Sequence, residues 1–122
     1  MLKLMPQELE VWYLLPSLRK ELAKLFIKDY ALSQREVSEI LGITESAVSQ
    51  YLKSKRAKKM KFSSMEMGEI KKTAGKIVHD KKNSRIYLYD LSKKLRGSEC
   101  MCIVHRKHDK TLPEDCRMCR ER

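Results

Sequence analysis

The chain has 122 residues and a mass of 14.4 kDa, which is enough for one small domain with an appendage but not for two full domains. Its 27 Lys and Arg against 16 Asp and Glu give a formal charge of +11, and 42% hydrophobic residues suffice for a core. There is neither an apolar run near the roughly 18 residues of a membrane span nor a signal peptide at the N-terminus. We therefore expect a cytoplasmic protein, without membrane contact, that binds a polyanion.

The charge is concentrated in the second half of the chain. Residues 1–52 hold six basic and seven acidic side chains, whereas residues 53–122 hold 21 basic and nine acidic ones. The densest block, residues 53–61, has six cations and no acid. Such blocks bind phosphate backbones by releasing condensed counterions, although a solvated, non-specific surface is the alternative.

The composition and the apolar spacing predict an all-α fold, because methionines are frequent while aromatics and glycines are few. A short apolar turn after Pro6 is predicted to end at Pro16, with Ser17 as the N-cap of the next helix. Asn83 or Ser84 is predicted to cap the last helix. The apolar spacing predicts helices over residues 18–30, 34–41, 45–52, 64–80 and 84–96.

The helices over 34–41 and 45–52 are joined by Gly-Ile-Thr, the helix-turn-helix pattern. Ser33 and Glu36 form a capping box before the first helix. Gly42 ends that helix, since glycine takes a left-handed turn without penalty, and Thr44 caps the second. An ordinary helical hairpin is the alternative, but all of these requirements are met within twenty residues. The inward-facing positions of the second helix leave a polar set facing outward: Glu45, Ser46, Ser49, Gln50 and Lys53.

Residues 33–56, SQREVSEILGITESAVSQYLKSKR, closely resemble the helix-turn-helix of Cro/C1-type (XRE-type) repressors. The wider stretch 16–56 is similar to small archaeal regulators and to the DNA-binding segment fused to archaeal thiamine-phosphate synthases. Ser38 departs from the alanine that is usual at the helix crossing, but it is small enough to keep the packing. The resemblance implies a four- to five-helix repressor-like domain and a transcriptional regulator. It does not imply the enzymatic half of those fusions, so we expect no enzyme.

The resemblance further implies that the second helix lies in the major groove of double-stranded DNA. Gln50 would then pair with adenine, while Glu45 would accept from cytosine or instead oppose the helix dipole. Tyr51 is expected to pack rather than to stack. Base contacts would come from Glu45, Ser46, Ser49 and Gln50, phosphate contacts from Gln34 and Thr44, and sequence-independent affinity from Lys53, Lys55, Arg56, Lys58 and Lys59.

Three regions follow from these patterns. Residues 1–62 form the DNA-binding region, and residues 63–97 form supporting or dimerisation helices. Of these, 63–80 is expected to complete the core and 84–96 to form a dimer seam, since a single motif binds weakly and pairs of motifs read pseudo-palindromic operators. Residues 98–122 form a cysteine-rich C-terminal tail.

All four cysteines lie in the last 23 residues, as Cys100-Met101-Cys102 and Cys116-Arg117-Met118-Cys119. Two close pairs in a cytosolic chain predict a metal rather than disulfides, and neighbouring cations favour thiolates. The four thiols predict either a zinc knuckle or an iron–sulfur cluster, and the unusual Cys-x-Cys spacing favours the cluster. A third set uses His105 with Cys102, Cys116 and Cys119 and leaves Cys100 spare. The alternative is a reduced tail without metal.

Two function classes follow. The first is a sequence-specific DNA-binding regulator, expected as a homodimer, whose metal centre is a redox sensor if it is an iron–sulfur cluster. The second is a non-sensing DNA- or RNA-binding accessory protein with structural zinc. A Gly-rich phosphate loop, paired catalytic carboxylates and a nucleophile elbow are absent from the sequence, which argues against catalysis.

Overall fold

A computed structural model describes residues 4–53, 60–113 and 116. Within these ranges every regular element is helical, which confirms the all-α prediction. In the same ranges no helix has both the length and the apolar character needed to cross a bilayer. The elements in chain order are α1 (Pro6–Leu9), a π-helical turn (Glu10–Leu14), α2 (Leu15–Lys28), α3 (Gln34–Leu41), α4 (Glu45–Leu52), α5 (Ser64–His79), a 3₁₀ turn (Lys81–Asn83), α6 (Ser84–Leu95) and α7 (Glu99–His108).

The first helical stretch continues through Pro16, so the predicted break at this residue is wrong. Leu14 and Leu15 keep right-handed helical backbone angles, and Ser17 is buried inside α2 rather than acting as an N-cap. A proline ring ordinarily clashes with the carbonyl four residues earlier. Here the preceding turn is wider, because the Leu15 N–H bonds to the Glu10 carbonyl five residues back. The wide turn accommodates the ring, and burial of the flanking apolar side chains stabilises the continuous helix.

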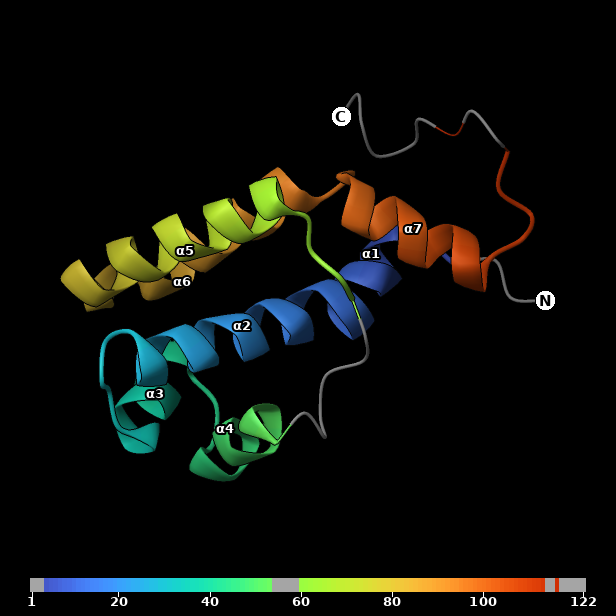
Figure 1. Ribbon diagram of the computed structural model, residues 1–122. Helices are drawn as coiled ribbons and strands as arrows, with labels where there is room; N and C mark the ends of the chain where they lie inside the picture. Colours follow the sequence, from blue (N-terminus) through green and yellow to red (C-terminus); the bar gives the residue numbers. More distant parts are fainter. Residues whose placement is uncertain (1–3, 54–59, 114–115, 117–122) are drawn as a thin grey trace.

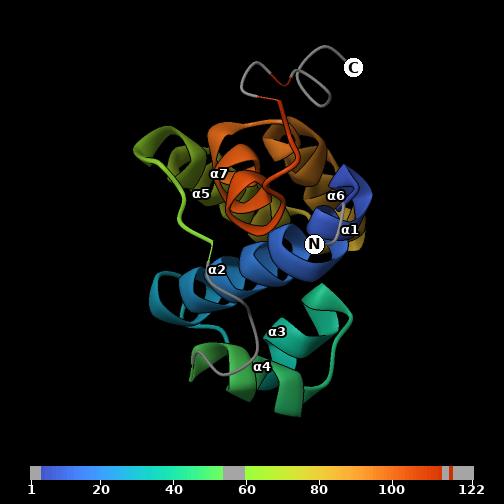
Figure 2. The same cartoon turned by 90° about the vertical axis from the view of Figure 1, so that its right-hand side faces the viewer.

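Helix α2 lies in the middle of the molecule (Figures 1 and 2). Helices α3 and α4 cover one side of it, and α5, α6 and α7 lie on the other. Its side chains Leu18, Leu22 and Phe26 are fully buried. The same core includes Val37 and Val48 from the α3–α4 side. Both halves of the molecule therefore share one hydrophobic core.

Helices α5 and α6 form where the sequence predicts them, and Asn83 stands at the N-cap position of α6 as predicted. Its side chain forms no capping bond, however, because it donates to Asp80 from the 3₁₀ turn. The hydroxyl of Ser84 donates instead to the Ile40 carbonyl at 3.0 Å, which ties the start of α6 to α3. The 3₁₀ turn leads directly into α6, since the Ser84 N–H bonds to Lys81, so a side-chain cap is not required.

Helix α7 occupies residues that the sequence predicts to be part of a cysteine-rich tail. Cys100, Met101 and Val104 are buried on one face of it and belong to the common core. The helix packs against α1, so two segments about a hundred residues apart in sequence lie side by side (Figure 2). At least residues 99–108 are therefore an integral part of the folded domain.

Candidate nucleic-acid interface

The α3–turn–α4 unit is built by local signals in its sequence. The Ser33 hydroxyl accepts from the Glu36 N–H at 3.1 Å, and the Glu36 carboxylate accepts from the Ser33 N–H at 3.3 Å. Gly42 ends α3 with a φ of 66°, a left-handed conformation that costs other residues free energy. Thr44 then caps α4, because its hydroxyl accepts from the Ala47 N–H at 3.0 Å. Both helix starts and the turn are thus fixed as the sequence predicts.

Packing between the two short helices and α2 determines which side of α4 faces outward. Val37 and Val48 are fully buried, and Tyr51 is 4% exposed, which confirms that this ring packs. Ser38 is buried near the turn, where its hydroxyl donates to the Arg35 carbonyl at 2.7 Å. The serine thus satisfies its hydroxyl locally. The carbonyl of Ser38 accepts the Ile43 N–H at 3.1 Å, which holds the turn against α3.

The opposite side of α4 is polar and accessible. Glu45 and Ser46 are exposed in the first turn, Gln50 is exposed one turn later, and Ser49 is half-buried beside it. Lys53, just after the helix, is also exposed. Helix α4 lies at the edge of the molecule, on the far side of α2 from α5 and α7 (Figure 1). The predicted base-contacting residues therefore share one accessible helix surface.

The predicted phosphate contacts are only partly within the described residues. Gln34, the first residue of α3, and Thr44 are exposed at helix starts, where backbone N–H groups favour anions. The remaining predicted cations of the basic block lie outside the described residues: Lys55, Arg56, Lys58 and Lys59.

The structure also brings distant cations beside α3, a placement that the sequence does not predict. Lys81 Nζ lies 3.9 Å from the Glu36 carboxylate, although 45 positions separate the two residues. Lys82 and Arg85 follow on the same short segment and are exposed. These cations lie close together in the sequence, but only the contact between α6 and α3 places them near the α3–α4 unit.

The geometry of α7 does not fit the predicted four-cysteine metal site. Cys100 is 2% exposed, and its sulfur lies 3.1 Å from the Ser98 hydroxyl. Burial and the neighbouring Glu66 carboxylate raise the pKa of the Cys100 thiol to about 12 in the chain without metal. Residues two apart on a helix also point about 200° apart, which separates Cys102 from Cys100.

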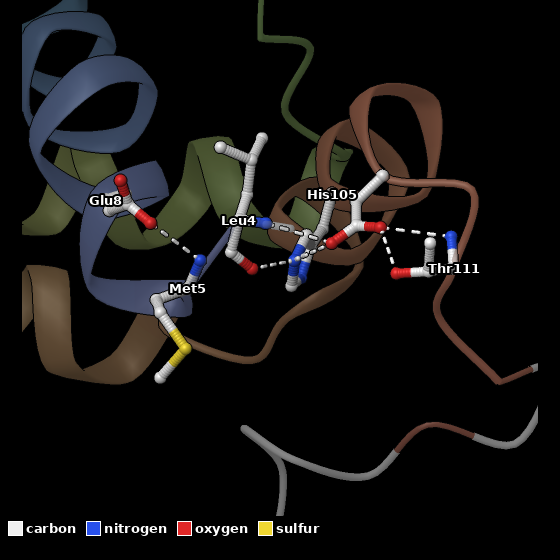
Figure 3. Close-up of polar contacts among 6 residues, drawn as sticks. Leu4, Met5, Glu8, His105 and Thr111 are labelled. Carbon is white, nitrogen blue, oxygen red and sulfur yellow. Dashed lines mark hydrogen bonds and ion pairs between the residues drawn. The ribbon is translucent and has the colours of Figure 1, made fainter. Parts of the chain in front are cut away.

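The alternative ligand set, which uses His105, also has a competing structural role. The Nε2 of His105 lies 2.6 Å from the Leu4 carbonyl and donates to it, since a carbonyl only accepts (Figure 3). Asp109 accepts from the Leu4 N–H at 2.9 Å. Hydrogen bonds from Thr111 and Leu4 lower the pKa of Asp109. His105 and Asp109 thus hold the N-terminal segment against α7.

The remaining thiols do not complete a site within the described residues. Cys102 and Cys116 are half-buried, and Cys119 lies outside the described residues. In the described part of the chain, no group of three ligating side chains converges.

Comparisons with protein-family models, with curated proteins and with solved structures found no match to this chain.

Proposed function

We propose that the chain is a sequence-specific DNA-binding transcriptional regulator of the helix-turn-helix type, without catalytic activity. The observation that carries this proposal is the polar, accessible side of α4, which the caps, the Gly42 turn and the buried Val48 together present outward. In this class of protein the second helix of the unit enters the major groove, and residues near its start contact base edges. The cytoplasm is the compartment that suits this role.

The side chains on α4 suit base recognition. Gln50 carries both a donor and an acceptor, which matches the N6 and N7 groups of adenine. Ser46 and Ser49 supply hydroxyls that hydrogen-bond to several bases. Glu45, at the start of α4, either accepts from cytosine or opposes the helix dipole.

Charge supports DNA as the partner. The exposed Lys53 follows α4, and Lys61 is exposed at the other end of the basic block. Lys81 lies beside α3. Cations on both sides of the unit favour approach to a phosphate backbone.

A homodimer on a pseudo-palindromic operator is part of the proposal. Ile86 and Tyr89 lie three residues apart on α6, and each is more than half exposed. Exposed apolar side chains on one helix face favour a protein partner. Two copies would double the number of base contacts.

The proposal does not include a metal centre that uses Cys100, because this thiol belongs to the core. The proposed DNA binding therefore does not depend on a zinc or iron–sulfur ligand at this position. The set of Cys102, His105, Cys116 and Cys119 stays a prediction.

Selection of binding sites from random duplex DNA tests the proposal. We expect enrichment of one sequence with two-fold symmetry, bound more tightly than unselected duplex at high salt. Single-stranded RNA is the competitor that tests the accessory-protein alternative. Equal binding to all duplexes, or stronger binding to the RNA, would contradict a sequence-specific DNA regulator.

Replacement of Gln50 by alanine should relax the preference at one base position of each half-site. We expect a loss of about 1–3 kcal/mol on the preferred base and little change on the others, because one bidentate contact disappears. Fluorescence anisotropy with single-base operator variants measures this loss. Gln7→Ala is the control, because Gln7 is exposed on α1, away from α4. Equal losses on every sequence would show that Gln50 does not read a base.

Joint replacement of Lys58 and Lys59 by glutamine should weaken binding to all duplexes. The salt dependence of the affinity should also become shallower. For each phosphate contact that is lost, binding releases about one counterion fewer. The slope of log affinity against log salt measures this effect. The matched control is Lys71→Gln with Lys72→Gln on the exposed side of α5. An unchanged slope would mean that the basic block does not contact phosphates.

A further inference from the structure

A groove of about 500 Å³ lies where α2, the end of α3 and the start of α6 meet. Its walls include Arg19 from α2, Ile40 from α3, and Arg85 and Leu88 from α6. Small-molecule sites in proteins typically have volumes of about 300–1,000 Å³. The groove therefore has room for a small ligand.

The charge lining this groove is positive. Arg19, Lys82 and Arg85 supply three cations. The carboxylate of Glu39 also lines the groove, but it pairs with Arg35 at 3.5 Å. Three cations around one carboxylate that is already paired favour a ligand with about two negative charges.

Arg19 supplies an independent indication of a ligand. Its Nε is buried, and among the described residues it has no hydrogen-bond partner. Buried polar groups in folded proteins are nearly always paired, and an unpaired one marks a place where a functional role, a water or an ion is expected. A guanidinium also matches the paired oxygens of a phosphate better than a single water does.

We propose that this groove binds a small organic phosphate. A phosphate monoester carries close to two negative charges at pH 7, which matches the three cations. Its oxygens accept from the guanidinium groups of Arg19 and Arg85, and its organic part lies against the apolar walls formed by Ile40 and Leu88.

The position of the groove gives the ligand a route to the DNA-binding unit, and this part rests on the proposed function. The Ser84 hydroxyl joins α6 to the Ile40 carbonyl of α3, and Gly42 of the turn also lines the groove. A ligand that bridges Arg19 of α2 and Arg85 of α6 while lying against Ile40 of α3 therefore holds α3 relative to both helices. Such a ligand changes DNA affinity by holding one orientation of the α3–α4 unit.

Titration of the full chain with phenyl phosphate tests the site, with the Nε–Hε signal of Arg19 followed by nuclear magnetic resonance. We expect a saturable shift that sodium chloride at equal ionic strength and benzyl alcohol do not reproduce. Arg19→Gln should weaken binding at least tenfold, and Arg85→Gln several-fold. Lys93→Gln, on the same helix α6 but absent from the groove lining, is the matched control and should leave the affinity unchanged.

Several outcomes would overturn the proposal. A shift that grows without saturation, or equal affinity in Arg85→Gln and Lys93→Gln, would mean that only general screening occurs. If Arg19→Gln does not fold, the Arg85→Gln comparison alone decides. An Arg19 signal that responds to duplex DNA and not to phenyl phosphate would assign the groove to the DNA backbone instead.

The binding test does not depend on DNA. If the chain selects no DNA sequence, the proposed function fails, yet the phenyl phosphate titration still decides the site. If the site is present and the chain binds a selected operator, phenyl phosphate should change operator affinity in the native chain and not in Arg85→Gln. Equal operator affinity with and without the probe would overturn the coupling to α3.

Discussion

Glu66→Gln should lower the free energy of unfolding at neutral pH by about 3 kcal/mol. The Glu66 carboxylate is 6% exposed and accepts from the Ser63 N–H and the Ser98 hydroxyl, each at 2.7 Å, and from the Cys100 N–H at 3.2 Å. It therefore caps the start of its own helix α5 and also the start of α7. An amide nitrogen cannot accept these bonds, so the substitution leaves donors unpaired.

The same residue should make the protein sensitive to acid. Burial by itself raises the pKa of Glu66, but the hydrogen bonds outweigh it and lower the pKa from 4.5 to about 2. The unfolded chain therefore takes up the proton first as the pH falls. Stability from Glu66 is complete above pH 4.5 and is lost between about pH 4.5 and pH 2, at a total cost of about 3 kcal/mol.

Urea denaturation at pH 7, 4 and 3 measures both effects. The native chain should lose stability across this range, and Glu66→Gln should lose less of it. Glu69→Gln is the matched control, since Glu69 lies on the same helix and forms ion pairs with Lys72 and Lys94 at the surface. Parallel pH profiles for the native chain and Glu66→Gln would show that Glu66 is not the group responsible.

Phe26→Ala should destabilise the fold by about 3–5 kcal/mol. Phe26 is fully buried on α2, which lies between the α3–α4 unit and the α5–α7 side. Removal of the ring leaves a cavity that the surrounding helices fill only in part. Because small domains are stable by about 5–15 kcal/mol, this loss leaves a substantially less stable protein.

Equilibrium urea denaturation at 25 °C measures this loss. Met65→Ala is the control, because Met65 is 85% exposed and its truncation should change stability by less than about 0.5 kcal/mol. Operator binding by Phe26→Ala should persist at low temperature and fail at a lower temperature than in the native chain. Similar urea midpoints for the two variants would contradict a central role of α2 in the core.

The α3–α4 unit could be predicted from the sequence because its signals are local. Ser33 with Glu36, Gly42 and Thr44 act over three or four residues, and each forms the contact that its residue type favours. The outward set on α4 followed from the spacing of Val48 and its neighbours. Local chemistry therefore sufficed for the part of the candidate interface within the described residues.

The errors arose where tertiary packing outweighs a local signal. Pro16 is a helix breaker in isolation, but the π-helical turn before it and the buried side chains around it keep the helix continuous. The spacing of Cys100 and Cys102 predicted metal ligands. Cys100, Met101 and Val104, however, have the spacing of a buried helix face. Ser98 at the N-cap position and Glu99 in the first turn were further sequence signals of helix α7. The groove was not predictable, because it joins residues from three distant helices.

The contact between Leu4 and Asp109 spans 105 positions of the chain, and this has a consequence for biosynthesis. While α7 is still inside the ribosome, the growing chain lacks Cys100, Met101 and Val104, and the N-terminal segment has no partner. The α3–α4 unit can form early from its local caps, but the shared core can close only after α7 emerges. The segment that completes this domain is therefore synthesised after all of the helices that it packs against, and a chain truncated before residue 99 would leave apolar surface for chaperones to cover.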